Sequence, residues 1–131
     1  MTMAARWSEV PTLGGHRVVL APLDAAHAPA LCELARSSGL HEAWYTNVPA
    51  PNAVERYIDK ALQQQALGKA LPFVVLDPDG QVVGSTRFYD LEPAVPTVEI
   101  GYTWYAPRVQ RTGLNTEAKL MLLEHAFEAM G

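Results

Sequence analysis

The spacing of apolar residues changes along the chain, and these changes predict its secondary structure. Short β-rich runs, either alternating or continuously apolar, are typical of strands. One such run ends near Pro22, because proline has no N–H to donate to a sheet ladder. The turn sequence Asp77-Pro78-Asp79-Gly80 separates two others and predicts a hairpin. The predicted strands cover residues 16–23, 71–76, 81–89 and 98–105.

Three other segments repeat apolar residues at the spacing of a helix. The first follows Asp24, a good N-cap, and stops at Gly39. The second opens at Asn52, which with Glu55 resembles a capping box, and runs to Gly68. The third follows residue 115, and one apolar stripe predicts its core-facing side. That stripe contains Leu120, Leu123, Phe127 and Met130, and it is broadened by Ala118, Leu122, Ala126 and Ala129.

The predicted order is strand, helix, helix, strand, strand, strand, helix. This order favours an α+β fold. No internal repeat or linker divides residues 1–131, so we expect a single domain with a poorly ordered segment at residues 1–13. The irregular, apolar segment at residues 40–51 either packs over the core or lines a pocket.

Composition narrows the classes of function. A formal charge of -4 and a pI of about 5.5 argue against a nucleic-acid or anionic-membrane binder, which needs a cationic surface. No window approaches the roughly 18 apolar residues of a membrane helix. The single cysteine, Cys32, forms no internal disulfide, and no Cys/His cluster has zinc-ligand spacing. These features predict a cytoplasmic protein without a metal.

The segment at residues 97–129 predicts a strand, a turn and a long helix. The first N–H groups of a helix lack intrahelical acceptors, and the helix dipole adds about half a positive charge there, so the turn suits a pyrophosphate. Gly113 removes a side chain where a phosphate approaches the backbone, although capping alone also explains it. Arg108 or Arg111 either adds a charged hydrogen bond or is solvated. The turn matches neither a P-loop nor a dinucleotide fingerprint.

Several motifs in and around this segment resemble the GNAT N-acetyltransferases, in particular their RimJ/RimL-type branch. The turn is similar to the family's acetyl-CoA loop, with Asn115 in place of a small residue. The resemblance extends over roughly residues 14–131 and implies the GNAT fold, an α+β fold of three layers with a mixed, mostly antiparallel sheet. It rests on the runs RVVLAPL at residues 17–23, EIGYTW at 99–104, QRTGLN at 110–115, the following TEAK, and HAFE at 125–128.

The resemblance also implies site residues. The strand backbone at Thr103, Trp104 and Tyr105 would bind the pantetheine arm. Glu99 is the candidate general base, with a solvated or Arg-paired glutamate as the alternative, and Tyr89 and Tyr102 are weaker candidates that core packing also explains. The loop backbone would hold the pyrophosphate at Gln110, Arg111, Thr112, Gly113, Leu114 and Asn115.

The implied function is transfer of acetyl from acetyl-CoA to a primary amine by direct attack on the thioester. The acceptor would be a protein N-terminus, an amino acid or another small amine. The alternative function is a truncated, non-catalytic module that binds CoA or oligomerises.

A full GNAT domain continues with further strands and a helix that this sequence lacks. Three explanations compete: a fragment of a longer enzyme, a shortened sequence, or a naturally truncated chain that pairs with a second copy. The first two are favoured. The third would use the open edge of the strand at residues 98–105 to form a homodimer.

Overall fold

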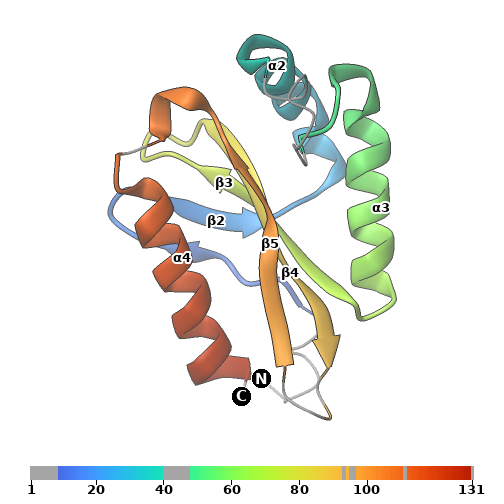
Figure 1. The fold of residues 1–131 in the computed structure, drawn as a ribbon, viewed down its shortest axis with the longest axis vertical. Helices are drawn as coiled ribbons and strands as arrows, with labels where there is room; N and C mark the ends of the chain where they lie inside the picture. Colours follow the sequence, from blue (N-terminus) through green and yellow to red (C-terminus); the bar gives the residue numbers. More distant parts are fainter. Residues whose placement is uncertain (1–8, 40–47, 93, 95–96, 111, 131) are drawn as a thin grey trace.

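The computed structural model describes residues 9–39, 48–92, 94, 97–110 and 112–130. Its strands form one antiparallel sheet, in which neighbours along the chain are also neighbours in space (Figure 1). β5 therefore lies at one edge of the described sheet. The strands are β1 (Leu13–Gly14), β2 (Val19–Pro22), β3 (Ala70–Leu76), β4 (Val82–Glu92) and β5 (Thr97–Tyr105).

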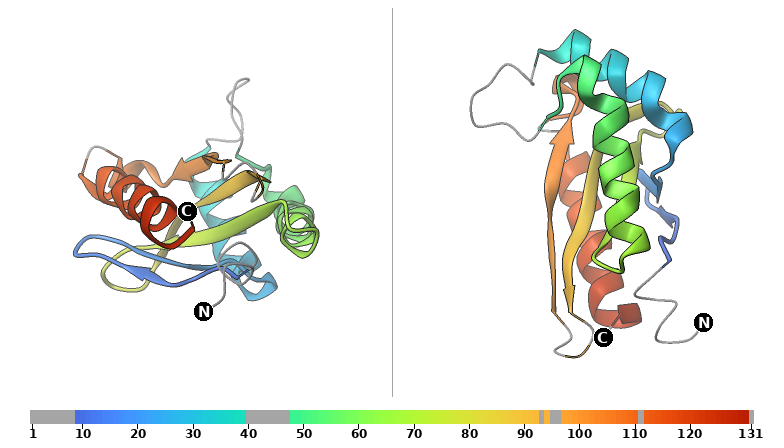
Figure 2. Two further views of the ribbon diagram at one scale, coloured as in Figure 1. Left: turned by 90° about the horizontal axis from the view of Figure 1, so that it is seen from below. Right: turned by 90° about the vertical axis from the view of Figure 1, so that its right-hand side faces the viewer.

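Helices cover both faces of this sheet, which gives the predicted three layers (Figure 2). One face carries α2 (Ala28–Ser38) and α3 (Val54–Ala66), and the other carries α4 (Leu114–His125). A π-helical turn, Ala126–Met130, continues α4. Short 3-10 turns precede the three helices: η1 (Ala25–His27), η3 (Pro51–Ala53) and η4 (Pro107–Val109).

Each face of the sheet has its own apolar cluster. Phe73 and Phe88, both fully buried, meet edge to face at 5.8 Å between ring centroids beneath α4. Val74 and Trp104 face the other way and pack with residues of α2 and α3. Alternate residues of a strand point to opposite faces, so neighbouring positions such as Phe73 and Val74 are buried in different clusters. The central strands are thus apolar on both faces, as the continuous apolar run predicts.

The predicted hairpin and the predicted order of elements are confirmed, with one strand missed. β1 pairs Leu13 with Leu20 and Gly14 with Val19, and a two-residue strand carries no readable period. Residues 1–8 of the segment expected to be poorly ordered lie outside the described residues. In the remainder, Val10 and Leu13 pack against the core.

The first predicted helix start is confirmed and the second is wrong. The Asp24 side chain accepts a hydrogen bond from the Ala26 N–H at 2.7 Å, and Gly39 ends α2 in the left-handed conformation. In contrast, α3 follows a 3-10 turn and has no side-chain cap, so Asn52 and Glu55 form no capping box. Pro51, at the first position of that turn, supplies a preset backbone angle instead.

The predicted core-facing surface of α4 is confirmed at Ala118 and Leu122 and is wrong for its central stripe. Leu114, Ala118 and Leu122 are buried, whereas Leu120, Leu123 and Phe127 are 60%, 41% and 78% exposed. The helix is apolar on two sides, so its periodicity does not tell which side meets the sheet. The buried side follows the i, i+4 row that starts at the first residue of the helix. The side chain of Met130 lies outside the described part.

Most of the irregular apolar segment at residues 40–51, including Trp44 and Tyr45, lies outside the described residues. Val48 is described and packs in the cluster under α2 and α3. No described helix is both long and apolar enough to cross a membrane. In the same described ranges, no three His, Cys, Asp or Glu residues gather in a group that would hold a metal ion.

Candidate functional site

The connection from β5 to α4 has the geometry of an anion-binding helix start. Gly113 precedes the helix with φ of +88°, in the left-handed region that side chains disfavour, and as a glycine it has no side chain to cap the helix. The backbone donors of the first turn therefore point into the loop without intrahelical acceptors. Together with the helix dipole, they make this helix start suitable for a phosphate.

The other loop residues divide between exposure and anchoring. Gln110 and Asn115 are exposed, Leu114 is buried in the core, and Arg111 lies outside the described residues. The Thr112 hydroxyl donates to the Val109 carbonyl at 2.6 Å and lies 3.4 Å from the Leu114 N–H. The loop is thus fixed in part by its own side chains.

Arg17 approaches this loop from the other end of the sequence, and sequence reasoning missed it. Its guanidinium donates to the Thr112 carbonyl at 3.2 Å, and its N–H donates to Glu117 Oε1 at 2.7 Å. A Cβ added at Gly113 would lie 3.6 Å from Arg17 Cδ and Nε. A cation therefore stands beside the helix start, 95 residues away in sequence, where no local pattern could reveal it.

Arg108, considered as a phosphate ligand, has a different partner. Its guanidinium forms an ion pair with Asp77 at 2.9 Å and a hydrogen bond with Gln81 at 3.2 Å. These contacts hold the loop before α4 against the β3–β4 turn. Arg108 is therefore an anchor of the loop.

The backbone of β5 at the predicted pantetheine-binding positions faces in two directions. The Ala106 N–H donates to the Val83 carbonyl at 2.7 Å. Because the backbone groups of successive strand residues point in opposite directions, those of Trp104 face β4 and those of Tyr105 face away from it. The outward carbonyl of Tyr105 accepts a hydrogen bond from Gln110 Nε2 at 3.2 Å. The Thr103 hydroxyl meets that of Thr86 at 2.7 Å across the two strands.

A β-bulge interrupts the pairing of β4 and β5. Ser85 pairs with Trp104 and Arg87 with Gly101, so β5 has one extra residue in this interval. Tyr102, within the bulge, has φ of +52°, which is an outlier for a bulky residue. A bulge leaves a residue out of the ladder and redirects its side chain. Here the redirected ring of Tyr102 lines a pocket.

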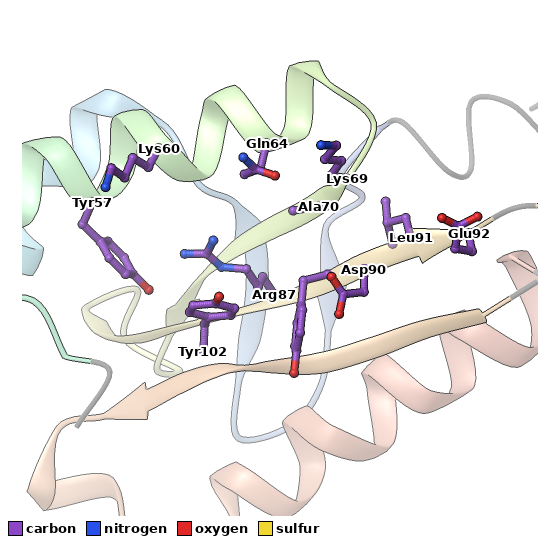
Figure 3. A pocket seen from close by; sticks show the side chains of 11 residues that line it. Tyr57, Lys60, Gln64, Lys69, Ala70, Arg87, Asp90, Leu91, Glu92 and Tyr102 are labelled. Carbon is purple, nitrogen blue, oxygen red and sulfur yellow. The ribbon is translucent and has the colours of Figure 1, made fainter. Parts of the chain in front are cut away.

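This pocket, of about 910 Å³, lies between α3 and the strands β4 and β5 (Figure 3). Figure 3 shows Arg87 pointing from β4 toward the rings of Tyr57 and Tyr102. The Arg87 Cζ lies 5.3 Å from the Tyr57 ring centroid and 4.3 Å from that of Tyr102. Arg87 is only 7% exposed. The pocket thus contains a nearly buried cation held between two aromatic rings.

Glu99, the candidate base, lies directly across from Tyr89 in the β4–β5 pairing. Opposed residues of a strand pair project to the same face, and Tyr89 lines the pocket. Burial raises the pKa of Tyr89. The hydrogen bond to Glu99 and the negative charge of the Glu99 carboxylate both raise this pKa further. The structure therefore brings Glu99, Tyr89 and Tyr102 to one side of the sheet.

Sequence reasoning did not identify the residues that form the rest of this pocket. Arg87 lies in a strand pattern and Tyr57 in a helix pattern, and each residue type is ordinary there. The strand of Arg87 also contains Ser85, Thr86, Asp90 and Glu92, so the sequence alone gave no signal that this arginine is nearly buried. Tyr57 and Arg87 meet only in the folded chain, where the Tyr57 hydroxyl of α3 lies 3.4 Å from that of Ser85 in β4.

The sequence profile described as the acetyltransferase (GNAT) domain matches residues 17–131. No curated protein sequence gives a significant match.

Solved structures resemble the whole described fold. A GCN5-related N-acetyltransferase from Brucella melitensis is 26% identical, with a TM-score of 0.77 over 94% of this chain and 57% of that one. RimJ from Mycobacterium smegmatis, solved with CoA-disulfide, is 24% identical, with a TM-score of 0.77 over 93% and 64%. RimL, a ribosomal-protein alpha-N-acetyltransferase solved with coenzyme A, is 19% identical, with a TM-score of 0.72 over 88% and 67%. The chain thus spans 57% to 67% of these proteins.

Proposed function

The chain belongs to the acetyltransferase (GNAT) domain family, and on that premise we propose that it transfers acetyl from acetyl-CoA to a primary amine. The transfer is of the RimJ/RimL type, because structures of that kind are among those that share its fold. The acceptor is a protein N-terminus, an amino acid or another small amine.

The start of α4 is the observation that carries this proposal. Gly113 supplies no side chain of its own at the helix start, and Arg17 stands beside it. These features suit the pyrophosphate of CoA, which is anionic and needs backbone donors. In the proposal the loop residues 110–115 hold the pyrophosphate, and the β5 backbone from Thr103 to Tyr105 holds the pantetheine arm.

The remaining tasks fall to the pocket side of β5. Bound acetyl-CoA supplies a thioester carbonyl that an amine can attack. The chain orients the two reactants, which is itself a large part of such catalysis. Glu99 accepts the proton of the acceptor's ammonium group, directly or through water. Tyr89, whose pKa is raised, stays protonated at neutral pH and donates to Glu99, which fixes the orientation of that carboxylate.

Calorimetric titration with acetyl-CoA tests the loop assignment. Gly113→Trp should abolish binding, because the indole fills the phosphate approach. Gly80→Trp is the matched control, since Gly80 also has a positive φ of +82° but lies in the β3–β4 turn with open space around its Cβ. Undiminished binding by Gly113→Trp, or equal loss in both variants, would remove the loop from the site.

A further inference from the structure

Backbone strain in this molecule is concentrated at the pocket between α3 and β4. Among the described residues, the non-glycine positions with positive φ are Asp90, at +51°, and Tyr102, at +52°. Both line the pocket, and both lie where the pairing of β4 and β5 shifts register. Strain of this kind persists where surrounding structure enforces it, and it gathers at ligand sites. The backbone at Asp90 and Tyr102, held in an unfavourable conformation, therefore helps to shape the pocket.

The charge of Arg87 has no anionic partner in the described part of the chain. No ion pair or hydrogen bond involves its guanidinium there, and its neighbours are the faces of Tyr57 and Tyr102. Tyr57 is held in place by its hydroxyl, which lies 3.4 Å from that of Ser85. A nearly buried guanidinium with only ring contacts keeps its hydrogen-bond donors for a ligand, and its planar fork matches a carboxylate.

The pocket wall carries charges of both signs. Lys60 of α3 lies near Tyr57, while Lys69, Asp90 and Glu92 lie toward the far end of β4 (Figure 3). The acids disfavour a dianionic group such as a phosphate, and the buried arginine disfavours a polyamine. A ligand with one carboxylate and one ammonium group fits both signs.

The register of β4 and β5 relates these charges to the proposed chemistry. Arg87 pairs with Gly101, and Tyr89 pairs with Glu99, two residues farther along each strand. The side chains of Arg87 and Glu99 thus project to the same face from neighbouring pairs. In an α-amino acid, a single carbon separates the carboxylate from the amine. With a carboxylate bound to Arg87, the amine can turn toward Glu99, which is exposed and lies on the same face of the sheet outside the pocket lining.

We propose that the acceptor is a free α-amino acid whose carboxylate binds Arg87 between the rings of Tyr57 and Tyr102. This inference rests on the proposed acetyl transfer and narrows its substrate class. The inference excludes a protein N-terminus as the acceptor, because the first residue of a protein has an uncharged amide where a free amino acid has its carboxylate.

Product binding tests this inference without turnover. The N-acetyl derivatives of the twenty amino acids, each paired with its α-carboxamide, are titrated calorimetrically into the full chain. We expect at least one carboxylate to bind about tenfold or more tightly than its carboxamide, because a charged hydrogen bond to arginine is lost in the amide. Arg87→Gln should abolish this preference. Arg56→Gln, an exposed arginine of α3 outside the pocket lining, should retain it.

Equal affinity for each pair in the unchanged protein, or no binding by any carboxylate, would overturn the inference, and neither result needs a variant to fold. The acetyl-CoA titration is read separately. If acetyl-CoA binds but no carboxylate is preferred over its carboxamide, only the hypothesis of an amino-acid acceptor is rejected. Carboxylate preference without acetyl-CoA binding removes the proposed acetyl transfer instead.

Discussion

Asp77 and Arg108 form an ion pair of 2.9 Å that joins the β3–β4 turn to the loop before α4. Asp77 also accepts hydrogen bonds from the N–H groups of Asp79 and Gln81, both at 2.9 Å. Burial alone would raise the pKa of this carboxyl, but the Gln81 amide, Arg108 and the Asp79 amide together lower it below the usual value. The ion pair thus connects a turn that is remote from the site to the backbone of the site.

We expect Asp77→Asn to lower the free energy of unfolding by about 1–3 kcal/mol at pH 7, since it weakens buried, charge-assisted hydrogen bonds. A lowered folded-state pKa stabilises the fold above the unfolded-state pKa of about 4, and this contribution is lost as pH falls through the folded value. Urea unfolding between pH 3 and 7 should therefore show a smaller pH dependence for the variant. Asp79→Asn, at an exposed position of the same turn, serves as the control.

The orientation of α4 predicts different effects for two leucines on the same helix. Leu122→Ala should lower the free energy of unfolding by about 2–5 kcal/mol, because Leu122 is 1% exposed in the core. Leu120→Ala should change it by no more than about 0.5 kcal/mol, because Leu120 is 60% exposed. Denaturant midpoints of the two variants measure this difference. Equal losses would contradict the orientation described here.

The order of elements could be predicted because each strand or helix of ordinary length carries its own period. The hairpin at residues 77–80 and the helix end at Gly39 depend on local chemistry that the sequence displays. Two errors came from choices that local pattern leaves open. Residues 120 and 122 are both leucine, so the sequence did not show which side of α4 faces the core. At the start of α3, a 3-10 turn beginning at Pro51 stands in place of the capping box predicted at Asn52.

The candidate site was predictable only where it is continuous in sequence. The loop at residues 110–115 carries a family motif and adjoins its helix, so it could be assigned. The pocket combines Tyr57 of α3 with Arg87 of β4 and Tyr102 of β5. Arg17, which lies just before β2, reaches the loop from a distant part of the sequence. These residues meet only through tertiary packing. A single sequence gives no measure of which distant residues share a contact.

Alkaline unfolding should reveal the burial of Tyr105. Burial raises the pKa of Tyr105 to about 12, above the value of about 10 in an unfolded chain. A raised pKa contributes stability that is complete below pH 10 and is lost as pH rises through 12. Tyr105→Phe should therefore reduce the fall in urea midpoint between pH 9 and 12. An unchanged pH dependence would show that Tyr105 ionises freely in the folded protein.

Glu99→Gln separates catalysis from binding. If Glu99 accepts the proton of the attacking amine, the variant should lower the rate constant of acetyl transfer about 10²–10⁴-fold, as loss of a general base does. The affinity for acetyl-CoA should stay unchanged, because Glu99 lies toward the start of β5, at the opposite end of that strand from the phosphate loop, and projects to the pocket side of the sheet with Tyr89. The measurements are thiol release for transfer and calorimetry for acetyl-CoA. Glu124→Gln, an exposed glutamate of α4, is the matched control for loss of a negative charge. Transfer by Glu99→Gln at the rate of the unchanged chain would assign the proton to another group on the same face, and Tyr89→Phe and Tyr102→Phe would then be measured in the same way.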